Sequence, residues 1–327
     1  MGQQFRIKRT VRVEPVSANG FATIDMPRGY DYEAIHVRFY GDINVTAAAT
    51  SVRAEAPTQA VKRVELIADG RNTIVSAPYW YSVLANYARE IKQSGSRSVT
   101  PPTAAAIASY SVEANGVIDL QTVDGERSKD SNFRTDGLQL LQLRLTFGAA
   151  LDMFVPGAGA AAFVNCFVEI STVELVEIKD ANGQRTLPKA LKKVSFQEVN
   201  VTASNSNLQT KLPAGNLIKS VVVRTEGLVT AGEPCTTMIN QAQLLSGVDV
   251  RVKASGAGLR GMNNADFGPI TAGYYVLDVT RNGSGWARLS ELWDVTQQAE
   301  PQLLMDVTGG ANGKLQAVIT EYLMQGA

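Results

Sequence analysis

Short runs in which hydrophobic and polar residues alternate dominate the chain. In the run LQLRLTF, which spans residues 141–147, every second side chain is apolar and the residues between are Gln, Arg and Thr. A period of two places one face of a strand in a core and the other face in water. Gly, Asn, Asp and Pro separate such runs, as is typical of turns between strands. We predict strands near 5–14, 20–26, 34–40, 61–67, 72–76, 108–120, 138–147 and 163–177 in the first half, and near 194–203, 207–212, 217–225, 248–253, 273–280, 286–294, 301–308 and 315–323 in the second.

Only one segment, residues 78–91, has the spacing of an amphipathic helix. Its apolar residues recur at steps of three and four, and its first residue is a proline, which suits a first helical turn. We expect this helix to pack across a sheet or against a neighbouring subunit, in which case Trp80→Asp would prevent folding or assembly. A ligand cage of aromatic rings is the alternative interpretation. The apolar stripe consists of Trp80, Val83, Leu84, Tyr87 and Ile91.

One phrase occurs twice, 186 residues apart: MPRGYDYEAIHVRFYG at 26–41 and LPAGNLIKSVVVRTEG at 212–227. A proline, two glycines, a valine and an arginine coincide without a gap. A second match places QLL at 139–141 over QLL at 302–304, and each copy then leads through a Gly-rich turn to a closing strand. The two matches predict a duplication, with a first domain at 1–178, a polar connector at 179–190 and a second domain at 191–327.

The duplication predicts an all-β protein made of two consecutive eight-stranded antiparallel units. Eight short strands that close into a two-sheet sandwich form a jelly roll, in which few strand edges stay open. We therefore expect a double jelly roll with one amphipathic helix in the first copy. A sandwich or barrel of another topology is left open, because the pattern does not determine strand order.

Charge is sparse and balanced. Lys plus Arg equals Asp plus Glu at 31 each, which argues against a general nucleic-acid binder. Charged residues make up 19% of the chain, below the ~25% typical of soluble domains. A surface poor in charge suggests that other copies cover much of it. One basic stretch is an exception, and it is either a solvated strand end or a contact for genome or lipid head groups. It contains Arg6, Lys8, Arg9 and Arg12.

Candidate chemistry is scarce. The one histidine, His36, lies in the repeated phrase, and Val222 takes its place in the second copy. A lone histidine is a poor basis for zinc or Ser-His-Asp chemistry, so we expect a strand-face residue and no enzyme. The acids Asp119, Asp124 and Asp130 lie in loops, and a facing carboxylate pair for glycoside cleavage cannot be placed among them.

Other sequence features also favour a protein without catalytic or cofactor chemistry. The two cysteines, Cys166 and Cys235, form no CxxC motif, and we interpret both as buried thiols in a reducing compartment. The opening MGQQFRIKRT has no apolar core of a signal peptide. No phosphate-cradling glycine motif occurs, so no cofactor is expected.

Three longer patterns, taken in order, are similar to one family. They are VKRVELIADGRNTIVSAPYWYSVLANYAREI (61–91), AGYYVLDVTRNGSGWARLSELWDV (272–295) and PQLLMDVTGGANGKLQAVITEY (301–322). With the duplication, they resemble the double jelly-roll major capsid proteins of tailless icosahedral bacteriophages and related larger viruses. The N-terminal segment is shorter than the long basic or helical arms of many members.

The resemblance implies a structural virion protein. Three chains would form a homotrimeric capsomer with a pseudo-hexameric outline, and capsomers would tile an icosahedral shell assembled in the host cytoplasm. Expected partners are further copies, penton and minor capsid proteins, and an internal membrane or genome at the inner surface. Two alternatives remain: another virion component such as a spike or receptor-binding β protein, and a carbohydrate-binding or carbohydrate-cleaving β-sandwich.

Overall fold

The computed structural model describes residues 6–47, 51–84, 96–99, 107–121, 132–155, 159–176, 190–228, 230–280, 289–298 and 300–324. The chain separates into two compact units, and the division falls between Lys192 and Lys193. Each unit is described by itself.

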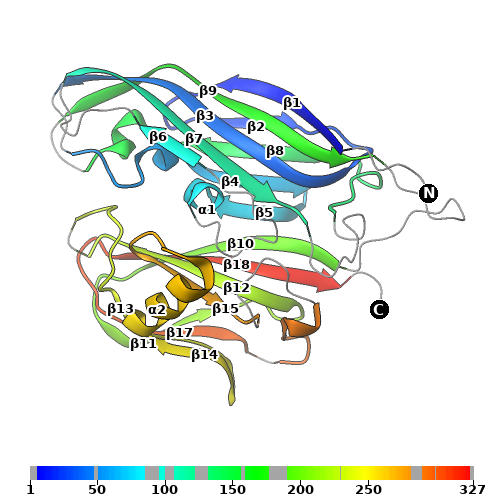
Figure 1. Cartoon of the computed structure of the whole chain (residues 1–327), viewed down its shortest axis with the longest axis vertical. Coiled ribbons are helices and arrows are strands. Elements are labelled where there is room, and N and C mark those ends of the chain that lie inside the picture. The colour runs from blue at the N-terminus through cyan, green and yellow to red at the C-terminus, as the bar shows by residue number, and fades with distance from the viewer. Residues whose placement is uncertain are drawn as a thin grey trace, which may run out of the picture. The chain divides into compact units, whose positions relative to one another are not determined.

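The first unit contains two antiparallel sheets, and Figure 1 shows them as two layers. The order in one is β1-β9-β3-β7-β6, and in the other β5-β4-β8-β2. Among the described residues, three short helical segments accompany them: α1 (Tyr79–Val83) and the 3-10 turns η1 (Ala56–Ala60) and η4 (Ala150–Met153). The strands are β1 (Arg6–Pro15), β2 (Phe21–Asp25), β3 (Asp31–Ala47), β4 (Val61–Ala68), β5 (Asn72–Pro78), β6 (Ser96–Val99), β7 (Ala108–Asp119), β8 (Leu141–Phe147) and β9 (Ala160–Leu175).

The second unit repeats this arrangement. Its sheets have the orders β15-β12-β18-β10 and β11-β17-β13-β14, and β16 adds a short pairing to β12. In the described part of this unit, one long helix, α2 (Gly256–Phe267), and the 3-10 turn η5 (Leu289–Glu291) accompany the sheets. The strands are β10 (Ala190–Asn200), β11 (Asn205–Lys211), β12 (Leu217–Glu226), β13 (Ile239–Ser246), β14 (Asp249–Ser255), β15 (Tyr274–Asp278), β16 (Trp293–Asp294), β17 (Gln302–Val307) and β18 (Lys314–Met324).

Both units therefore have jelly-roll connectivity. In each unit, the first strand pairs with the last, the last with the third, and the third with a strand that follows the helix. These strands are β1, β9, β3 and β7 in the first unit and β10, β18, β12 and β15 in the second. The facing sheet consists of β2, β8, β4 and β5 in the first unit and of the equivalent strands β11, β17, β13 and β14 in the second. The topology that the sequence left open is thus a jelly roll, present twice, and the predicted double jelly roll is confirmed.

The repeated phrase marks equivalent strands, β3 and β12. Its four glycines all take positive φ angles: 107° at Gly29 and 146° at Gly41 in the first copy, and 84° at Gly215 and 78° at Gly227 in the second. Such angles favour glycine because it has no Cβ. The phrase recurs because both jelly rolls need a turn before this strand, at Gly29 and Gly215, and a glycine backbone further along it. That second glycine lies at a bulge inside β3 (Gly41) and directly after the last residue of β12 (Gly227).

Alternating side chains fill the space between the two sheets of each unit. In the first, Val37 and Phe39 of β3 and Leu143 of β8 are fully buried. In the second, Val223 of β12 and Leu303 of β17 belong to one apolar core. Full burial of such a side chain stabilises the fold by about 1.5–3 kcal/mol, so the cores account for the strand register that the alternation predicts.

The helix prediction was partly wrong. The structure assigns α1 to Tyr79–Val83 with Leu84 as its C-cap, so this helix ends at Val83, and residues 85–91 of the predicted helix lie outside the described part. Pro78 does not begin the helix: its backbone is extended, at φ −66° and ψ 148°, and it is the last residue of β5.

The second helix, α2, was not predicted. Glycines at three of its first six positions conceal its pattern, and only Gly256, Leu259 and Asn263 are buried. Its N-terminus is set by Ser255, whose hydroxyl accepts a hydrogen bond from the Gly258 amide at 3.1 Å. Two strands were also missed, β6 and the glutamine-rich β13, and the described part of 286–294 contains mainly the η5 turn and the two-residue β16.

Candidate functional site

The described residues contain no cluster of three or more His, Cys, Asp or Glu side chains that could hold a metal ion. No helix in that part of the chain is long and apolar enough to cross a bilayer. His36 is half-buried on β3, opposite Ser171 and Val117. Val222 occupies the matching place between Val318 and Val276. The histidine therefore stands at a strand-face position that takes an apolar residue in the other copy.

The structure places one of the three candidate loop acids. Asp119 is buried at the end of β7, and its Oδ2 lies 2.9 Å from the Lys192 ammonium, which is also buried. Asp124 and Asp130 lie outside the described residues. A buried ion pair of this kind binds two chain segments together and leaves no free carboxylate at Asp119 for acid–base work.

Strand β1 brings together the basic residues near the N-terminus and pairs most of them. Arg6 donates to Glu33, with Nε 2.7 Å from Oε2. Arg9 donates to Glu174 through Nε at 3.1 Å and Nη2 at 3.0 Å. Arg12 donates to Glu14 on its own strand at 2.5 Å, and Lys8 is exposed. Three of the four cations are therefore neutralised within the chain, so a contact with genome or lipid stays a prediction that rests on Lys8 most directly.

Helix α1 is buried along its whole length, including Trp80 and Val83 of the predicted stripe. Leu84 is half-buried, whereas Tyr87 and Ile91 lie outside the described residues. The Tyr79 hydroxyl lies 2.6 Å from the Val37 carbonyl and 2.8 Å from the Ala114 carbonyl, and burial raises its pKa. A Cβ at Gly116 would lie 2.6 Å from the Tyr79 ring. Gly116 thus makes room for the residue that docks α1 on the sheet.

Arg38 of the repeated phrase forms an ion-pair network on the outer face of the first unit's larger sheet. Its Nε donates to Glu113 at 2.8 Å, and its Nη1 lies 3.3 Å from Glu169. The hydrogen bond to Glu113 raises the pKa of Arg38. Its guanidinium also lies 4.6 Å from the centre of the Tyr40 ring, within the range of a cation–π contact.

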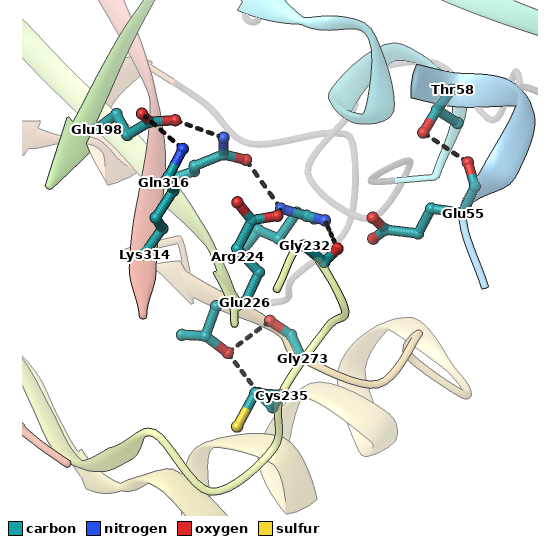
Figure 2. Close-up of polar contacts among 11 residues, drawn as sticks. Glu55, Thr58, Glu198, Arg224, Glu226, Gly232, Cys235, Gly273, Lys314 and Gln316 are labelled. Atoms are coloured by element: carbon teal, nitrogen blue, oxygen red, sulfur yellow. Dashed lines mark hydrogen bonds and ion pairs between the residues drawn. The ribbon is translucent and has the colours of Figure 1, made fainter. Parts of the chain in front are cut away.

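Arg224 is the equivalent arginine in the second unit, and its side chain is only 1% exposed. It pairs with Glu226 and donates to Gln316 at 3.1 Å and to the Gly232 carbonyl at 3.3 Å (Figure 2). Gln316 faces Arg224 in the strand register just as Glu169 faces Arg38. Glu198 extends the network, accepting from the Gln316 amide at 2.7 Å, and the Lys314 ammonium lies 3.6 Å from it.

The acidic and amide partners of these arginines were not found from the sequence. Glu113 and Glu169 lie 75 and 131 residues from Arg38, and Gln316 lies 92 residues from Arg224. The repeated arginine itself was the available signal, because it marks one structural position in two copies. These clusters are ion pairs and amide bridges that connect strands, an arrangement suited to a rigid building block.

The two units together define a class of fold, the double jelly roll that viral major capsid proteins have. Along almost its whole length the chain superposes on solved structures of this class. The crystal structure of the STIV major capsid protein matches with a TM-score of 0.74 at 18% identity, covering 99% of this chain and 97% of the other. The atomic structure of Sulfolobus Turreted Icosahedral Virus gives a TM-score of 0.75 at 18% identity, over 98% and 91%.

A bacteriophage protein has the same fold. The major capsid protein P2 of bacteriophage PM2 matches with a TM-score of 0.58 at 13% identity, covering 99% of this chain and 98% of P2. No protein-family model matches the chain, and neither does any curated protein sequence. At these identities the similarity establishes the fold, and function has to be argued further.

Proposed function

We propose that this chain is the major capsid protein of a tailless icosahedral virus and acts as a structural protein rather than an enzyme. The observation that carries the proposal is the pair of jelly rolls in one chain, each with the same strand order, matched over 97–98% of the length of two capsid proteins. Other folds with one jelly roll would leave half of this chain unmatched.

The proposed building block is a homotrimer. Two jelly rolls per chain, at 1–178 and 191–327 joined by the connector 179–190, give six similar domains in three chains and so a pseudo-hexameric outline. Capsomers of this shape pack side by side into a shell. The low content of charged residues, 19%, supports large subunit interfaces, because the centres of such interfaces are depleted in charge.

Further partners follow from this role. Penton and minor capsid proteins would fill the vertices and seams, and Lys8 with its neighbours would face an internal membrane or the genome. Assembly would take place in the host cytoplasm. The match to the capsid protein of bacteriophage PM2 supports a bacteriophage as one kind of virus to which this chain would belong.

Light scattering of the purified chain, coupled to size exclusion, tests the proposal. A mass near 105 kDa, three times the 35.1 kDa of one chain, is expected. A monomer at all concentrations would contradict it. Electron microscopy of a lysate then separates the alternatives. A capsid protein is the main component of round, tailless particles, whereas a spike or receptor-binding protein is a minor one and a carbohydrate-binding sandwich is absent from particles.

A further inference from the structure

Strand β1 is attached to its sheet in an unusual way. It lies at the edge of the sheet and pairs with β9, and none of its ten side chains is buried. The equivalent strand in the second unit, β10, buries Val194, which is 3% exposed. Because apolar burial is the main force that holds strands in place, β1 must be held chiefly by its backbone ladder and its polar side chains.

Two arginines form those polar attachments, and their partners belong to other strands. Arg6 binds Glu33 with two hydrogen bonds, and Arg9 binds Glu174 in the same bidentate way. Glu33 is the extra residue of a β-bulge between Tyr32 and Ala34, and such bulges redirect side chains. The glutamates are 2% and 0% exposed, whereas the arginines are 48% and 41% exposed.

The groups that bind β1 therefore belong to β3 and β9, and we call them, with the edge of β9, the seat of β1. Thr172 donates to Glu174 and helps to fix it, and Glu169 and Ser171 are within hydrogen-bond distance of Thr10, at 3.1 Å each. The seat consists of a strand edge with two buried carboxylates, and it is complementary to an extended segment that carries arginines three residues apart. Recognition of this kind is strand addition with charged side-chain anchors.

We infer that this seat exchanges its occupant, so that β1 of a second copy of the chain can replace β1 of the same copy. The second copy is the occupant that fits, because its β1 carries the same two arginines and the same register and makes every contact again. An exchanged β1 would connect two neighbouring copies, because the strand of one copy would pair with β9 of the other. The inference does not rest on the proposed function, since it concerns any two adjacent copies.

A labelled synthetic peptide of residues 6–16 tests recognition, with full-length protein titrated against it in fluorescence anisotropy. The peptide with Arg6→Ala and Arg9→Ala is expected to bind at least about tenfold more weakly, since charge-assisted hydrogen bonds are lost. The peptide with Lys8→Ala and Arg12→Ala has the same net charge as the Arg6→Ala, Arg9→Ala peptide, but it keeps Arg6 and Arg9. It should bind like the original, because Arg12 pairs with Glu14 on its own strand. Equal binding by the two variants, or no binding by any peptide, would overturn the inference.

Disulfide trapping tests exchange between copies. Thr10 and Ser171 face each other in the β1–β9 register. A ¹⁵N-labelled Thr10→Cys chain is mixed with an unlabelled Ser171→Cys chain and oxidised, and mass spectrometry maps the bond between the introduced thiols. A labelled–unlabelled link is expected. If the chain carrying both substitutions closes its own bond while the mixture forms no link, strand exchange does not occur, and a normal trimer mass in the same sample would leave the proposed function standing.

Discussion

Arg38 and Arg224 hold equivalent places in the two jelly rolls, yet their surroundings differ. The side chain of Arg38 is 42% exposed and meets two glutamates, whereas that of Arg224 is 1% exposed and meets Glu226 and Gln316. Glu169 faces Arg38 in the strand register, whereas Gln316 faces Arg224. A neutral amide suits the buried site, because a second carboxylate beside Glu226 would add charge repulsion. One residue type thus serves a surface pair in one copy and a buried network in the other.

Substitution of these two arginines should have unequal effects. Arg224→Ala is expected to lower the free energy of unfolding by about 3–5 kcal/mol, because Glu226 loses its buried counter-charge. Arg38→Ala should cost about 1 kcal/mol or less, since exposed pairs contribute little. Urea unfolding of both variants measures the difference. Equal losses in the two variants would contradict the burial argument.

Alkaline pH should destabilise the protein through buried acidic groups. Burial raises the pKa of Tyr79 and Tyr32, and it raises the pKa of the Cys166 thiol to about 11. In the unfolded chain the pKa is about 10 for tyrosine and about 8.5 for cysteine, so above those values the folded state binds more protons and stability falls as pH rises. The Tm should therefore decline from about pH 9 upward, with the cysteine acting first.

Tyr79→Phe is the control for this decline. The variant should be less stable at pH 7, because two backbone carbonyls lose a hydroxyl partner. Above about pH 10 its Tm should fall less steeply than that of the original chain. A Tm that stays level to pH 11 in the original chain would refute the linkage.

At the level of elements, strands were easier to predict than helices. Alternation such as that of Leu141–Phe147 follows from one buried face, and the two-sheet core preserves it. Helix α2 could not be predicted, because only three of its residues are buried and glycines interrupt its pattern. Strand β13, with sequence INQAQLLS, was missed because bulges between Ile239 and Gln241 and between Leu244 and Leu245 interrupt its alternation. Local propensity is a weak guide where tertiary contacts decide.

Helix α2 protects the open edge of strand β15. The Asn263 side-chain amide donates to the Val276 carbonyl at 2.7 Å, and its oxygen accepts from the Val276 amide at 2.8 Å. Unpaired groups at a strand edge invite wrong pairing, and here one asparagine satisfies both. Asn263→Ala should therefore lower the free energy of unfolding by about 1–3 kcal/mol and increase aggregation.

Met262→Ala is the matched control, because Met262 lies on the same helix and is 46% exposed. Thermal unfolding and light scattering of both variants make the comparison. If Met262→Ala lost as much stability as Asn263→Ala, the helix rather than the edge contact would be responsible.

At the scale of the whole molecule, the duplication was the feature that the sequence revealed best. A proline, two glycines, a valine and an arginine coincide in the two copies, and a second match of QLL supports the same duplication. The arginine marks one register position that both jelly rolls share. The polar networks around that arginine were beyond prediction, because their members lie on strands that only the fold brings together. Assembly is harder still to predict from one sequence than the polar networks, because subunit interfaces depend on how several copies are arranged.

Single-particle cryo-electron microscopy of the purified chain tests the capsomer most directly. The expected result is a particle of three chains whose six jelly rolls form a ring with a pseudo-sixfold outline. Particles that contain one chain, or rings built from another number of chains, would contradict the proposal that this double jelly roll is a capsid building block.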